Sequence, residues 1–171
     1  MGFEAGIVVR HGDSYKDNDY FWSTCGWDRT NLVDTLIRAF SDNEYSSIND
    51  LAGKTAEGAF DFEVEKLGFF QELRERLMIG THGIYKNLRE LYVLELDDVA
   101  DEYFESLSPT EKVAFYRQFY FEDTTKLNLA KSLLLDIEVR YDYLFIINSL
   151  ADAYNKLQEE GIDTAEFYIS Y

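Results

Sequence analysis

Strand-like sequence stands at the two ends of this chain, and helical patterns fill the region between them. Residues 3–10 and 20–25 are short apolar segments, and the polar stretch that separates them is rich in turn residues. Two such segments joined by a short turn predict an antiparallel hairpin. The last residues, AEFYISY (165–171), alternate like a third strand. We therefore predict a small antiparallel sheet made of the N-terminal hairpin and the C-terminal strand.

Apolar residues recur at helical spacing through the rest of the chain, which predicts several helices. The expected ranges are a helix from just after residue 28 or 30 to about 40, then 48–54, 62–78, 85–107, a helix beginning at 108, 127–135 and 143–158. We expect a break in the fourth helix near Leu96. Asp28 or Thr30 is expected to cap the first helix, and Gly161 to end the last one. Ser108 and Glu111 have the spacing of a capping box.

The predicted fold class is α+β and helix-rich, with the small sheet covered by helices. The chain has 171 residues, of which 46% are hydrophobic, and this is enough to bury a core. It has one proline and no linker-like segment, so we predict a single domain over residues 1–171. Cys25 is the only cysteine and no segment is apolar enough to span a bilayer. We expect a cytoplasmic protein with no cofactor, no metal and no membrane contact.

The charge of the chain limits its partners. The net charge is −17, which repels nucleic acid and anionic membranes and attracts basic protein surfaces. The acids are densest in a segment without any base, which contains Glu90, Glu95, Asp97, Asp98, Asp101, Glu102 and Glu105. The aromatic residues near them are candidates either for the core or for contact with a partner: Tyr92, Tyr103, Phe104, Tyr116 and Tyr120.

Carboxylates along a rigid scaffold imitate the regular negative charge of a nucleic-acid backbone. The first hypothesis is therefore a non-catalytic acidic protein that binds a basic partner, such as a nuclease or a defence effector, and blocks its nucleic-acid site. Antirestriction or anti-CRISPR-like proteins of phages or mobile elements, which in the case of phages act in the host cytoplasm, and immunity proteins against nuclease toxins belong to this class. Another hypothesis is a structural or assembly subunit that forms a homo-oligomer.

The motif GIVVRHGDS (6–14) raises an enzymatic alternative. It resembles the first motif of the histidine phosphatases, and MIGTHGIYKNL (78–88) resembles the segment that carries their second catalytic histidine. The resemblance implies that Arg10 binds phosphate, that His11 is the nucleophile and that His82 is the second histidine. The chain departs from the family pattern at Leu51, where a second phosphate-binding arginine is expected. A phosphohydrolase that uses His11 is the alternative hypothesis.

A second short motif, GWDRTN (26–31), resembles the end of the active-site loop in phosphoinositide phosphatases of the myotubularin and Sac types. In that loop the nucleophilic cysteine stands six positions before the arginine. Ser23 occupies that position relative to Arg29, and Cys25 is only four positions before it. The motif is therefore interpreted as the start of a helix. DDVADE (97–102) places three acids on one helical face but lacks the glycine turn of a calcium loop, so a solvated face is expected there.

Overall fold

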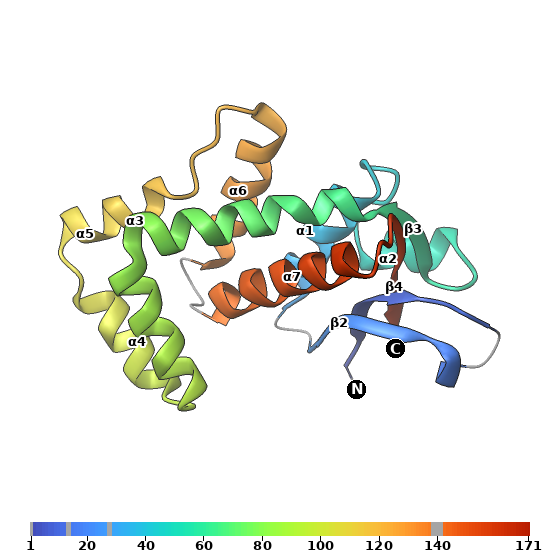
Figure 1. The fold of residues 1–171 in the computed structure, drawn as a ribbon, viewed down its shortest axis with the longest axis horizontal. Coiled ribbons are helices and arrows are strands. Elements are labelled where there is room, and N and C mark those ends of the chain that lie inside the picture. Colours follow the sequence, from blue (N-terminus) through green and yellow to red (C-terminus); the bar gives the residue numbers. More distant parts are fainter. Residues whose placement is uncertain (1, 13–14, 27–28, 138–141) are drawn as a thin grey trace. The chain divides into compact units, whose positions relative to one another are not determined.

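The computed structural model describes residues 2–12, 15–26, 29–137 and 142–171 (Figure 1). The chain forms two compact units. Unit 1 comprises Met1–Gly68 and Asp152–Tyr171, and unit 2 comprises Phe69–Ala151. Unit 2 is therefore an insertion in the sequence of unit 1. The single domain expected for residues 1–171 stays a prediction.

Unit 1 contains one four-stranded antiparallel sheet with the order β2-β1-β4-β3. Its strands are β1 (Glu4–Val9), β2 (Asp19–Cys25), β3 (Ala59–Glu63) and β4 (Thr164–Ser170). β1 pairs with β2 as a hairpin and with β4 on its other side, where Gly6 lies opposite Tyr168. The predicted α+β class is confirmed, as is the pairing of the hairpin with the C-terminal strand.

The structure corrects the helix expected over residues 62–78 at its beginning. Residues 59–63 form β3, which pairs with β4, and Val64–Leu67 form a short 3-10 helix. Phe62 is buried while Asp61 and Glu63 are exposed, which is the two-residue period of a strand. The Phe62 ring stacks on Phe40 with 4.8 Å between the ring centroids, and this contact secures β3 to the core.

The helices of unit 1 cover one face of the sheet. α1 (Thr30–Phe40) buries Leu32, Val33, Leu36, Ile37 and Phe40 at helical spacing. Phe40 also contacts Phe167 of β4, with 5.7 Å between the ring centroids. Arg29 is the N-cap residue of α1, so the predicted cap at Thr30 is wrong because Thr30 is already the first helical residue. Asp28 lies outside the described residues.

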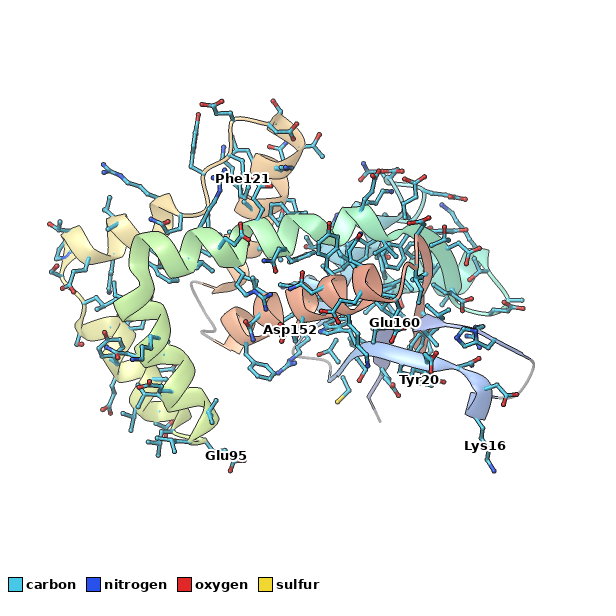
Figure 2. All side chains as sticks on the ribbon, viewed as in Figure 1. Lys16, Tyr20, Glu95, Phe121, Asp152 and Glu160 are labelled. Carbon is cyan, nitrogen blue, oxygen red and sulfur yellow. The ribbon has the colours of Figure 1, made fainter. Side chains whose placement is uncertain are left out.

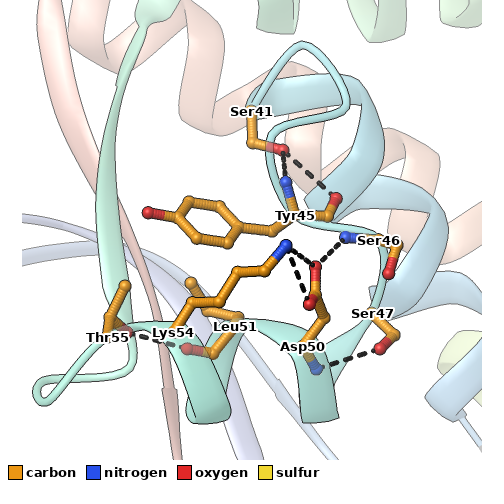
Figure 3. Close-up of polar contacts among 8 residues, drawn as sticks. All are labelled: Ser41, Tyr45, Ser46, Ser47, Asp50, Leu51, Lys54 and Thr55. Carbon is orange, nitrogen blue, oxygen red and sulfur yellow. Dashed lines mark hydrogen bonds and ion pairs between the residues drawn. The ribbon is translucent and has the colours of Figure 1, made fainter.

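Polar contacts hold the loop before α2 (Ile48–Lys54) and the turns of α2 itself, as Figure 3 shows. The Ser47 hydroxyl accepts a hydrogen bond from the Asp50 N–H and caps α2. The Asp50 carboxylate accepts a hydrogen bond from the Ser46 N–H at 2.9 Å and contacts Lys54 Nζ at 3.0 Å. These contacts favour the charged carboxylate, and the Ser46 N–H in particular lowers the pKa of Asp50.

Unit 2 is helical in its described residues. Its helices are α3 (Gly68–Val93), α4 (Asp97–Ser106), α5 (Pro109–Arg117), α6 (Thr124–Ile137) and the first part of α7 (Asp142–Glu159). Residues 79–84 were expected to separate two helices over 62–78 and 85–107. This expectation is wrong, because α3 is continuous through Gly80 and Gly83. Each glycine costs about 1 kcal/mol in a helix, and α3 continues through both in spite of this cost. Figure 1 shows that α3 bends along its length.

Several predicted helix ends are confirmed. The break near Leu96 separates α3 from α4. The capping box is complete, since the Ser108 hydroxyl accepts from the Glu111 N–H and the Glu111 carboxylate accepts from the Ser108 N–H. Gly161 has φ +70° and ends α7. In the part of the chain that the structure describes, no helix has the length and apolar character needed to cross a membrane.

The two edges of the sheet are short or irregular. Ile7 pairs with Trp22 and Val8 pairs with Tyr20, so β2 carries Phe21 as an extra, bulged residue. β3 has only five residues and exposes two acids. Bulges, short length and charge all discourage pairing with another strand. The sheet edges therefore do not favour an interface between copies of the chain.

Candidate functional site

The candidate phosphatase residues Arg10 and His11 lie at the end of the N-terminal hairpin and contact carboxylates. The Arg10 Nε donates to Glu166 Oε1 at 2.8 Å, and this hydrogen bond raises the pKa of Arg10. The His11 Nε2 lies 2.8 Å from Asp19 Oδ2. A phosphate at this position would have to displace both carboxylates. His82 is a residue of α3, and its side chain lies outside the described part of the structure.

The face of the sheet next to Arg10 is organised around Tyr168. Its hydroxyl donates to Glu4 Oε1 at 2.6 Å, and its ring makes an edge-to-face contact with Tyr20. Burial of the phenol, followed by its hydrogen bond to Glu4, strongly raises the pKa of Tyr168. Tyr168 therefore remains a neutral donor at physiological pH. Its geometry indicates a structural role, because the ring covers Gly6. The phosphohydrolase hypothesis stays an untested prediction.

The acidic segment of the sequence places a row of carboxylates on one side of α4. Ala100, Phe104 and Leu107 are buried on the opposite side. The exposed acids form what we call the acidic row, which consists of Asp98, Asp101, Glu102 and Glu105. Their separations of three and four residues place neighbouring side chains about 5–6 Å apart on the helix surface. The buried side fixes the orientation of α4, and this orientation keeps the row in solvent.

The other predicted acids lie beside this row in the sequence. Glu90 is exposed near the end of α3, and Glu95 is exposed in the turn between α3 and α4. Asp97 begins α4, and its side chain is outside the described part. Figure 2 shows the Glu95 side chain pointing away from both helices. All of the described acids predicted to contact a partner are therefore exposed within one unit.

Neighbouring carboxylates of the acidic row repel one another. Like charges at spacings of three or four residues cost about 0.2–0.5 kcal/mol per pair. Within the row Glu105 lies 3.4 Å from Lys112 Nζ, and outside it Glu90 lies 3.9 Å from Lys86 Nζ. Across the described residues, no group of three or more His, Cys, Asp or Glu side chains is arranged to hold a metal ion.

The aromatic residues near the acids divide between core and surface. Phe104 is buried, with its ring centroid 5.4 Å from that of Phe115 and 6.1 Å from that of Tyr116. Tyr103 and Tyr116 are half-buried, and Tyr120 is 60% exposed. The side chain of Tyr92 is outside the described part. Phe104 therefore belongs to the core of unit 2.

Four apolar residues in and next to the α3–α4 connection were missed by the sequence analysis as candidate contact residues. They are exposed and form what we call the apolar turn: Val93, Leu94, Leu96 and Val99. The sequence signal was present in VLEL (93–96), because apolar residues surround a helix break where glycine, asparagine or serine is typical. The apolar turn and the acidic row are adjacent in the sequence and overlap on the first turn of α4.

Comparison with known proteins gives no relative. No family model, no curated protein and no solved structure matches the chain.

Proposed function

We propose that this protein is a non-catalytic, acidic binding protein that covers a basic, nucleic-acid-binding surface of a partner protein. The observation that carries the proposal is the acidic row of α4. Its carboxylates are exposed on one side of a helix whose other side is buried.

Regular spacing and rigidity make such a row suitable for a basic groove. A nucleic-acid backbone presents closely and regularly spaced negative charges, and a protein that binds it neutralises them with Lys and Arg. Carboxylates on side chains whose Cβ atoms lie about 5–6 Å apart on a helix present the same sign of charge at a similar density. The partner's basic side chains would then contact α4 in place of the nucleic acid.

The overall charge supports the same kind of partner. A net charge of −17 attracts a basic protein over a distance and raises the rate of encounter, while it keeps nucleic acid itself away. A nuclease or a defence effector with a basic channel fits this description. Inhibition would follow from occlusion of the channel, with no reaction at the interface.

The proposal is tested by affinity capture from a bacterial lysate on the immobilised protein, at about 50 and 500 mM salt. A captured partner is then purified, and its binding to DNA is measured with and without this protein. The test variant carries Asp98→Lys, Asp101→Lys and Glu102→Lys. The control carries the same change of charge at exposed positions of unit 1: Glu159→Lys, Glu160→Lys and Asp163→Lys.

We expect the wild type and the control to compete with DNA for the partner, and the test variant to lose this competition. The affinity should fall at least about tenfold between the two salt concentrations, because charge pairing dominates the contact. Binding that is insensitive to salt, or an equal loss in both variants, would contradict the proposal. Circular dichroism shows whether α4 remains folded in the test variant.

A further inference from the structure

The apolar turn is the feature of unit 2 that the acidic binding function leaves unexplained. Val93 and Leu94 are each 66% exposed, Leu96 is 41% exposed and Val99 is 45% exposed. Single exposed apolar residues are ordinary, but four of them within seven positions of the chain are unusual and mark a candidate contact site.

The backbone of this turn is also less stable than it would be with a glycine at its left-handed position. Glu95 adopts φ +57°, which is the left-handed region where glycine is preferred. The Leu96 N–H donates to the Leu91 carbonyl at 2.9 Å, so the turn closes as a helix C-cap with a charged residue in the glycine position. Leu96 is at the same time the N-cap of α4, and its side chain makes no capping hydrogen bond. The sequence keeps an apolar side chain where a polar one would stabilise the helix.

The occupant of this surface is indicated by the charges around it. Glu90, Glu95, Asp98 and Glu102 are exposed and alternate with the apolar residues along the chain. These negative charges repel nucleic acid and anionic membranes, and they complement a protein surface rich in Lys and Arg. Interfaces commonly combine a central apolar contact with a polar rim.

We propose that the apolar turn is the anchor of the partner interface, and that it inserts into an apolar pocket bordered by basic residues on the partner protein. This inference rests on the proposed function and adds the chemistry of the partner's surface to it. The acidic row supplies long-range attraction and orientation, and Leu94 and Leu96 supply the desolvated contact that slows dissociation.

Two labelled peptides of equal length and charge test the inference by fluorescence anisotropy. One is a Lys/Leu peptide patterned as an amphipathic helix, and the other is polylysine with glycine spacers. The test variant is Leu94→Ser with Leu96→Ser. The control is Val113→Ser, which removes exposed apolar surface elsewhere in unit 2.

We expect the wild type and the control to bind the amphipathic peptide at least about tenfold more tightly than polylysine, a difference of about 1.4 kcal/mol. The test variant should bind both peptides equally and keep the wild-type affinity for polylysine. Thermal unfolding should show that the test variant is as stable as the wild type or more stable, because serine is a better N-cap than leucine.

Other outcomes separate the two proposals. Equal binding of both peptides by the wild type, or the same loss in the control, overturns the apolar anchor and leaves the acidic function intact. Failure of both peptides to bind overturns the acidic function. A dimer detected by sedimentation and abolished in the test variant would make a second copy of the chain the occupant, and binding to neutral phosphatidylcholine vesicles would make it a membrane. Either result overturns the inference.

Discussion

Gly6 is the position at which the sheet tolerates no side chain, and Gly6→Ala tests this directly. Gly6 lies in β1, between β2 and β4. A Cβ atom at this position would lie 2.6 Å from the Trp22 carbonyl oxygen and 2.7 Å from the Tyr168 hydroxyl oxygen. Both distances are too short for a contact. The Trp22 carbonyl is backbone in the neighbouring strand, so the strands or the Tyr168 ring must move.

The cost follows from three terms. Forcing a methyl group into a packed site costs about 1–3 kcal/mol. Displacement of Tyr168 breaks its hydrogen bond to the Glu4 carboxylate, and a bond to a charged group contributes about 1.5–3 kcal/mol. Replacing glycine recovers about 0.5–1 kcal/mol of backbone entropy. We therefore expect Gly6→Ala to lower the free energy of unfolding by about 2–5 kcal/mol, a large part of the stability of a typical domain.

Urea unfolding followed by tryptophan fluorescence measures this loss, because both tryptophans of the chain lie in the sequence of unit 1. The control is Gly53→Ala in α2, where an added Cβ meets no atom within 4 Å. The control should gain about 0.5–1 kcal/mol. If Gly6→Ala costs less than about 1 kcal/mol, which is below the range of ordinary overpacking, the close packing of Tyr168 on β1 would be refuted.

Three further predictions concern helix ends and charge. Ser108→Ala removes the capping box of α5 and should lower stability by about 1 kcal/mol, seen as a lower melting temperature. Asp50→Asn tests the lowered pKa of Asp50, which its contacts with the Ser46 N–H and Lys54 cause. Because the pKa of Asp50 in the folded protein lies below the ordinary value of 3.8, the wild type should be more stable than the variant above that pH, and the difference should vanish as the pH falls through the folded pKa. Urea unfolding at a series of acidic pH values measures this difference in stability. A difference that does not change with pH would contradict the lowered pKa of Asp50. Glu95→Gly relieves a left-handed backbone and should raise stability by up to about 1 kcal/mol in thermal unfolding, whereas a loss would show that Glu95 has a stabilising role in the turn.

The sequence predicted those parts of the fold that depend on local patterns. The hairpin, the C-terminal strand and the cap at Ser108 each follow from a few neighbouring residues. β3 was missed because its pairing is with β4, a strand about a hundred residues later in the chain. Leu67, Phe70 and Leu73 have helical spacing and follow shortly after β3. The helix predicted from this spacing was therefore begun too early, inside β3.

The candidate site also has one part that local patterns predict and one part that they do not. The exposure of the acidic row follows from the spacing of Ala100 and Phe104, because the opposite side of a helix must face solvent. The exposure of Leu94 and Leu96 does not follow from any local rule, since leucine is usually buried. It depends on how α3 ends and α4 begins, which the sequence indicates only through a missing turn residue.

The position of β4 has a consequence for the order of folding. β4 is the last strand in the chain, yet it lies between β1 and β3 and is the strand through which β3 joins the sheet. During synthesis the hairpin and β3 leave the ribosome well before β4 does. The backbone groups of β1 and β3 that pair with β4 therefore stay unpaired until β4 has been made. Contacts between residues so far apart in sequence form slowly. The sheet therefore closes only after unit 2 has been made, which gives chaperones a defined interval in which to protect β1 and β3 from aggregation.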